Sequence, residues 1–164
     1  MLTWVYGSGP LVVVPESELP HWNGCPHTDG PLEEWGDYGR ACTVEGYVGL
    51  VDVGAHQGLV LGDLPASTTF LEEERLFLRW VGADSEEELV TEARQALRDG
   101  VQWDDDEDVL WDVPGPVVLI DATMPGSEPE PDNHLVVDIA PARCRVRAAY
   151  RDDNSYMILV QLQP

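Results

Sequence analysis

The sequence predicts an α+β fold, mainly antiparallel β-sheet with one principal helix at about residues 85–98. Two observations lead to this class. Short runs of β-branched and aromatic residues recur along the chain between glycine, proline and acidic turn residues, which is typical of antiparallel strands. One segment instead repeats its apolar residues at helical spacing. The strands form either one large sheet or a sandwich-like pair of sheets, with the helix packed on a face.

The amino-terminal quarter begins with strands and continues without regular periodicity. Residues 2–6 and 11–14 flank the turn sequence Gly-Ser-Gly-Pro, which predicts an opening hairpin or a bulged strand. Residues 15–40 are rich in proline, glycine, histidine and tryptophan and follow neither the helical nor the strand period. We expect a long irregular excursion there, with one helical turn near residues 31–35.

Four runs after this excursion predict a meander of antiparallel strands. Residues 44–53 and 58–61 flank a hairpin loop, and residues 68–71 and 76–81 flank a charged turn. Each run is short and rich in β-branched and apolar residues. Because consecutive antiparallel strands are joined by short turns, we expect the four runs to continue one pattern.

The principal helix follows Ser85. Its hydroxyl is placed to cap the amide of Glu88, and the Glu88 carboxylate to return a bond to the Ser85 amide, which is a capping box. Gly100 ends the helix. A single apolar stripe runs along it, made of Leu89, Ala93, Ala96 and Leu97.

The carboxyl-terminal third predicts further strands. A proline-rich acidic segment at residues 124–133 separates the first two, and we expect it to be exposed and mobile. A turn at residues 152–155 joins the last two in a final hairpin. The expected strands are residues 117–120, 135–139, 143–151 and 156–162.

Length and charge restrict the class of protein. A chain of 164 residues is the size of one domain, so we expect residues 1–164 to form a single domain. Its 31 Asp and Glu outnumber its 9 basic residues, for a net charge of −22. This field disfavours nucleic acid and anionic membrane as direct ligands and favours encounter with a basic protein. The alternative is that the protein comes from an acid-rich proteome, in which all proteins have strongly acidic surfaces and the charge has no specific role.

The sequence also predicts where the protein acts. The amino terminus has no basic region followed by an apolar core, and 18 consecutive apolar residues occur nowhere, so we expect neither a signal peptide nor a membrane span. The three cysteines are odd in number and irregularly spaced. Reduced thiols in the cytoplasm suit that pattern better than a disulfide framework.

An acidic segment after the helix is the predicted partner-binding site. Charged clusters with aromatic neighbours suit a basic protein surface, because carboxylates steer the encounter and rings fill pockets at the centre of an interface. The alternative is a solvated loop between helix and strand. The residues of the predicted site are Trp103, Asp104, Asp105, Asp106, Glu107, Asp108 and Trp111.

Signals for catalysis are weak. Gly7-Ser8-Gly9 has no following helix that would make a nucleophile elbow, and no phosphate-binding loop or dinucleotide fingerprint occurs. We therefore predict no enzyme activity, no cofactor and no metal. A small metal-binding regulator or enzyme stays as the alternative, and its candidate residues are His21, Cys25, His27 and Cys42, whose spacing matches no common zinc pattern.

Several sequence blocks occur in a defined order along the chain. They are Trp4 with Ser8-Gly9-Pro10 and the run to Pro15, Trp22-Asn23-Gly24, residues 37–42, residues 59–63 with Pro65 and Thr68-Thr69, and Arg79-Trp80 ahead of Ala83-Asp84-Ser85. In this order they resemble the bacterial family called immunity protein 21. The resemblance covers about residues 2–100 well and the rest of the chain loosely.

This resemblance implies a role that composition could not name. Members protect the producing cell or its kin in polymorphic toxin systems by binding a cognate toxin as stoichiometric inhibitors, much as antitoxins do. The whole chain would then be one immunity-protein-like domain whose partner is a toxin, with a basic nuclease as one candidate. Tryptophans and glycines of the motif, such as Trp22 and Gly24, are expected to hold the fold, and the acidic surface to contact the toxin.

Overall fold

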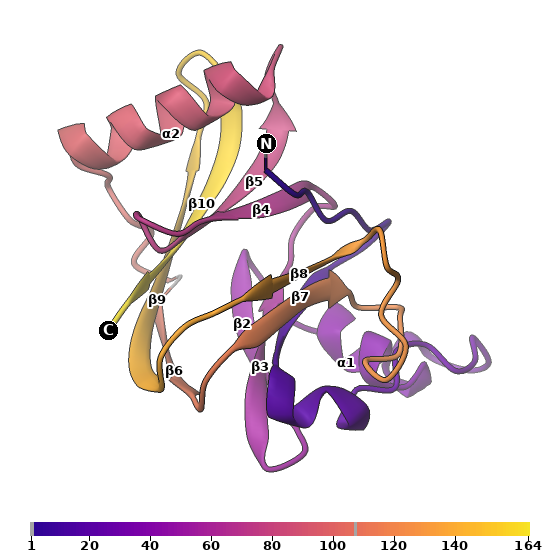
Figure 1. The fold of residues 1–164 in the computed structure, drawn as a ribbon. Coiled ribbons are helices and arrows are strands. Elements are labelled where there is room, and N and C mark those ends of the chain that lie inside the picture. The colour runs from indigo at the N-terminus through magenta and orange to yellow at the C-terminus, as the bar shows by residue number, and fades with distance from the viewer. Residues whose placement is uncertain (1, 107) are drawn as a thin grey trace.

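Two antiparallel sheets of five strands each pack face to face in the computed structural model, which describes residues 2–106 and 108–164 (Figure 1). The first sheet has the strand order β2-β3-β1-β7-β8, and the second has the order β4-β5-β10-β9-β6. The predicted α+β class is confirmed. Of the two predicted architectures, the chain adopts the sandwich-like pair of sheets.

The strands and helices have the following bounds. The first sheet contains β1 (Leu11–Pro15), β2 (Val48–Val53), β3 (His56–Leu61), β7 (Val117–Asp121) and β8 (His134–Val137). The second contains β4 (Ser67–Leu71), β5 (Leu76–Gly82), β6 (Asp108–Val113), β9 (Ala142–Arg151) and β10 (Tyr156–Gln163). The helices are α1 (Asp37–Cys42) and α2 (Glu86–Asp99), with 3-10 turns η1 (Glu16–His21) and η2 (Leu32–Glu34).

Apolar side chains fill three layers. The main core lies between the sheets, and residues such as Leu59 of β3 and Ile158 of β10 are fully buried in it. A second cluster behind the first sheet contains Trp22, whose indole Nε1 donates to the carbonyl of Ala122 at 3.1 Å. Trp22 therefore has the structural role expected of it. A third cluster lies between the second sheet and α2.

The principal helix covers part of the outer face of the second sheet, as predicted (Figure 1). Ser85 Oγ accepts from the amide of Glu88 at 3.1 Å, so this part of the expected cap is present. Leu89 and Ala93 of the apolar stripe are fully buried. Among the described residues, no helix combines the length and the apolar character that crossing a bilayer requires.

The predicted opening hairpin is wrong. Val5 does not pair with the strand that follows it but bridges Thr68 of β4 in the opposite sheet, through hydrogen bonds of 2.8 and 2.9 Å. The reason is burial, because this bridge places the Val5 side chain, which is 0% exposed, in the core between the sheets. A local hairpin offers less apolar contact than this long-range bridge.

The predicted meander is correct in its hairpins and wrong in its continuity. β2 pairs with β3, and β4 pairs with β5, as expected. The two hairpins nevertheless belong to different sheets. The chain crosses from one sheet to the other directly after β3, where Asp63 has a φ of 73°.

Arg79 of β5 holds this crossing in place. Its side chain is fully buried, and its guanidinium donates to the carbonyls of Gly62 and Leu64 at 2.7 and 2.9 Å and to Thr68 Oγ1 at 3.2 Å. Burial lowers the pKa of Arg79 to about 10, and the charge of Asp63 acts in the opposite direction. The group therefore stays cationic at neutral pH and donates to the two carbonyls of the crossing, of which that of Gly62 also accepts from the amide of Leu64 at 3.1 Å.

Replacing Arg79 by methionine should destabilise the fold. Arg79→Met removes three side-chain hydrogen bonds from the buried crossing, and we expect the free energy of unfolding to fall by about 2–3 kcal/mol. Urea denaturation followed by tryptophan fluorescence measures the change. Arg98→Met is the control, because exposed Arg98 bonds only to Gln95 among described residues, and it should change stability by less than about 0.5 kcal/mol. Equal stability of the two variants would show that the crossing does not depend on Arg79.

Candidate functional site

The predicted acidic segment lies along the second sheet. Gly100, with a φ of 96°, turns the chain away from the end of α2. The amide of Asp104 then donates to the carbonyl of Ala148 in β9 at 3.0 Å, so the segment runs beside that strand before β6 begins. Glu107, which belongs to the prediction, lies outside the described residues.

Trp103 anchors the segment. Its half-buried ring packs against the apolar cluster beneath α2, and the guanidinium of Arg147 lies 4.6 Å from the ring centroid. A cation at this distance is attracted to the face of an indole. These two contacts orient the Trp103 side chain, and part of it lines an open cavity.

This cavity, together with a smaller one beside it, forms what we call the acidic groove. The larger cavity has a volume of about 450 Å³ and the smaller about 190 Å³, and both are lined by Arg151 and Asp153. The walls of the larger cavity are residues 101–105 and residues 150–153. The smaller one lies against α2 and is lined also by Glu92, Gln95, Ala96, Asp99, Asn154, Ser155 and Met157.

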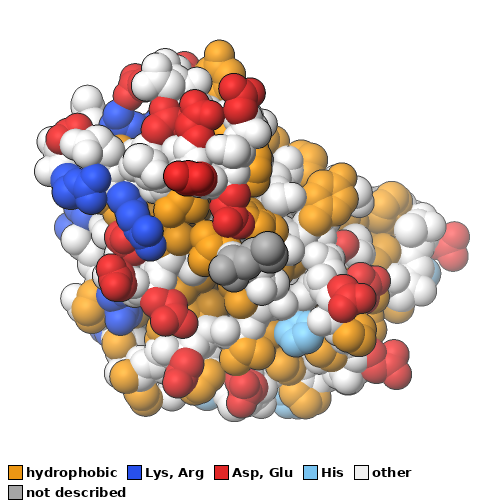
Figure 2. Space-filling model, turned by 45° about the horizontal axis from the view of Figure 1, so that its top comes forward, with side chains coloured by type: hydrophobic (Ala, Val, Ile, Leu, Met, Phe, Trp, Pro, Cys, Tyr) orange, Lys and Arg blue, Asp and Glu red, His pale blue; other side chains and the backbone are white. Residues whose placement is uncertain are grey.

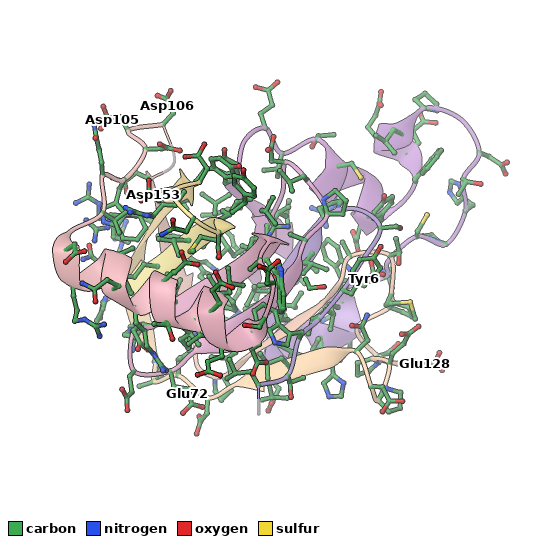
Figure 3. All side chains as sticks on the ribbon, turned by 90° about the horizontal axis from the view of Figure 1, so that it is seen from above. Tyr6, Glu72, Asp105, Asp106, Glu128 and Asp153 are labelled. Carbon is green, nitrogen blue, oxygen red and sulfur yellow. The ribbon has the colours of Figure 1, made fainter. Side chains whose placement is uncertain are left out.

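Negative charge dominates the acidic groove. Asp104, Asp105 and Asp152 line the larger cavity. Arg151 is the one basic residue in the described lining of that cavity, and it forms an ion pair with Asp153. Asp105, Asp106 and Asp153 lie at the same end of the molecule (Figure 3). On the face drawn in Figure 2, acidic side chains are widely spread, whereas arginines gather at one side. The groove thus presents several carboxylates to an incoming cation.

Asp108 is already paired. It begins β6 and accepts hydrogen bonds of 2.8 and 3.0 Å from Nε of Arg145 on the neighbouring strand. Hydrogen bonding to this guanidinium lowers the pKa of the Asp108 carboxyl, with a smaller contribution from the charges of Arg145 and Arg147. Asp108 therefore lies on the outer face of the sheet and not in the lining of the acidic groove.

Trp111 cannot serve as the second aromatic anchor. It is 0% exposed and lies in the core between the sheets, where its Nε1 donates to the carbonyl of Gln57 at 2.8 Å. The cause is β6, a strand that the sequence analysis did not predict. In the sequence Asp-Val-Leu-Trp-Asp-Val, Val109, Trp111 and Val113 alternate with outward residues, and this period of two was the signal that would have identified the strand.

The opposite wall of the acidic groove was also not predicted. Tyr150, Arg151, Asp152 and Asp153 belong to the end of β9 and the turn after it. The sequence analysis assigned them to a terminal hairpin without a functional role. No sequence signal joins them to Asp104, because the contact follows from the packing of that segment on β9.

The candidate ligands of the alternative site are not gathered into one cluster in the described part of the chain. His21 ends η1, whereas Cys25 Sγ donates to the carbonyl of His27 at 3.5 Å and Cys42 ends α1. No group of three or more His, Cys, Asp or Glu side chains among the described residues is arranged to hold a metal ion.

Comparison with known proteins identifies one family. The model of the family described as immunity protein 21 matches residues 3–155. The match includes both walls of the acidic groove and extends well beyond the blocks found by inspection. No curated protein and no solved structure matches the chain.

Tyr38, near the alternative site, predicts an alkaline transition. Burial raises its pKa to about 12 from the usual 10.0, and a hydrogen bond with Cys42 and the charges of Cys42, Asp121 and Cys25 add to the shift. Above pH 10 the tyrosine of the unfolded chain ionises, which lowers the free energy of the unfolded state, while Tyr38 of the folded chain stays neutral. The contribution of Tyr38 to stability is therefore lost as the pH rises from about 10 to about 12. Near-ultraviolet absorbance should show a late phenolate step whose amplitude falls by one tyrosine in Tyr38→Phe. Tyr6→Phe, at an exposed position, should leave the late amplitude unchanged, and an unchanged late amplitude in Tyr38→Phe would contradict the assignment.

Proposed function

The chain belongs to the immunity protein 21 family, and from this premise we propose that it neutralises a cognate polymorphic toxin as a stoichiometric inhibitor that contacts the toxin through the acidic groove. The family match over residues 3–155 is the observation that carries the proposal. It implies a toxin as the partner. In this proposal residues 1–164 act as one immunity domain.

Charge argues for a basic toxin surface. The net charge of −22 repels anionic surfaces and accelerates the approach of a cationic one. Asp104, Asp105 and Asp152 line an open cavity, and none of them belongs to an ion pair of the described residues, so these carboxylates are available without unfolding any element. Tyr150, which is 40% exposed, adds an aromatic contact at the same place. These features support a cationic segment of the toxin as the occupant.

Occlusion is the mechanism that follows. A specific inhibitory interface buries on the order of 1,600 Å² in total, which is more than the groove alone supplies. The groove would therefore receive a basic segment while the surrounding surface covers the active site. For a basic nuclease, the carboxylates would take the positions of the phosphates of its substrate.

The proposal assigns the chain a binding role without catalysis or cofactor. Its expected partner is the toxin protein, without direct contact to nucleic acid or membrane. We expect it to act in the cytoplasm, and the free thiols of Cys25, Cys42 and Cys144 are compatible with a reducing compartment.

Co-expression tests the immunity role. Producing the toxin encoded beside this chain's gene should arrest cell growth, and producing both proteins should restore it. A pull-down with the purified toxin should recover a one-to-one complex. If neither a complex nor growth is recovered, this toxin is not the partner.

Charge neutralisation tests the contact site. Asp104→Asn, Asp105→Asn and Asp152→Asn, all in the lining of the larger cavity, should together slow toxin association about tenfold or more at low salt, because steering depends on charge near the contact. Glu72→Gln, Glu73→Gln and Glu128→Gln change net charge equally at other exposed positions, two of which are labelled in Figure 3, and should have a much smaller effect. Stopped-flow association at two salt concentrations gives both rates. Equal slowing by the two triple variants would place the contact outside the acidic groove.

A further inference from the structure

A loop that the acidic groove does not use projects from the first-sheet side of the molecule. Residues 26–34, which we call the finger, form the purple loop that extends beyond α1 in Figure 1. Every residue of the finger is exposed. Sequence analysis predicted an irregular excursion with one helical turn here, and η2 is that turn.

The base of the finger is closed by backbone hydrogen bonds. The amide of Tyr38 donates to the carbonyl of Gly24 at 2.9 Å, which brings together the segments before and after the finger. The amide of Cys25 donates to the carbonyl of Thr123 at 3.0 Å and ties this base to the end of β7. Gly24 is required there, because a Cβ atom at its φ of 65° would lie 2.4 Å from the Thr123 oxygen.

The finger also has internal support. Trp35 Nε1 donates to the carbonyl of Gly30 at 3.1 Å, so the indole joins the end of the finger to its middle. The amides of Glu34 and Trp35 donate to the carbonyls of Pro31 and Leu32 at 2.9 and 3.0 Å. These bonds hold a loop of exposed residues in a defined conformation.

The chemistry of the finger is apolar and acidic. Leu32 is 41% exposed on η2. Asp29, Glu33 and Glu34 are exposed around it, and the finger contains no lysine or arginine. A single exposed leucine is ordinary on a protein surface. Here it is held out on a projecting, internally bonded loop with carboxylates before and after it in the sequence, so a concave surface could contact these groups together.

We propose that the finger enters a concave, positively charged surface of the toxin, with Leu32 in an apolar pocket and the carboxylates of Asp29 and Glu33 against a basic rim. This inference rests on the proposed function and adds a second contact to it. The ordered loop loses little conformational freedom on binding, so more of the contact energy appears as affinity. The finger is built on first-sheet elements and the acidic groove on the second sheet, so the two contacts can be tested separately.

Affinity measurements with the purified toxin encoded beside this chain's gene test the finger. Leu32→Asp in the full chain should weaken binding about tenfold or more, as expected for an apolar anchor. Val136→Asp is the matched control, because Val136 is a 50% exposed apolar residue on β8, and it should bind within about twofold of the unsubstituted protein. The thermal transitions of both variants should match that of the unsubstituted protein, which separates lost contact from lost folding.

Crosslinking gives a readout that does not depend on affinity. A photoreactive phenylalanine analogue at position 32 should crosslink to the toxin, whereas the same analogue at position 136 should not. If Leu32→Asp binds normally and position 32 does not crosslink, the finger is not a contact. If in that case the triple substitution in the acidic groove still slows association, the proposed function stands without the finger. Absence of any complex with the unsubstituted chain would overturn both proposals.

Discussion

The buried guanidinium of Arg79 is the interaction on which the relative position of the two sheets depends. Burying a charged group is costly unless it is fully hydrogen-bonded, and here it bonds to two carbonyls and one hydroxyl at the point where the chain leaves β3 for β4. The sequence blocks at residues 59–63, Thr68 and Arg79 are distant along the chain and meet at this crossing. Their role is therefore structural, and they leave the recognition of a partner to other surfaces.

Those surfaces follow from the sandwich. The second sheet supports the acidic groove, because β9 holds Asp104 through a backbone bond and carries Tyr150 and Arg151 at its end. The first sheet supports the finger, because the end of β7 binds its base. A rigid pair of sheets thus presents two acidic elements whose separation does not depend on flexible linkers. Such preorganisation would favour tight binding of the proposed partner.

Charge is unevenly distributed within this acidic protein. β9 carries Arg143, Arg145, Arg147 and Arg151, and acidic side chains of neighbouring segments lie against several of them. Asp108 and Asp112 of β6 are paired in this way with Arg145 and Arg143 of β9. Asp104, Asp105 and Asp152 have no such cross-strand partner among the described ion pairs. Their negative charges can therefore attract a cationic ligand to the acidic groove.

The sequence alone determined the features that local interactions control. The cap and apolar stripe of α2 and the hairpins β2–β3, β4–β5 and β9–β10 depend on neighbours in the chain, and all were predicted. Trp103 and Asp104 were identified as candidates because charge and aromatic residues are visible in a sequence. Only the tertiary structure decided that Val5 pairs with Thr68, that Trp111 is core and that Asp152 and Asp153 complete the groove. These outcomes depend on burial of apolar surface between segments far apart in the chain, and that free energy is defined only after the two sheets have packed.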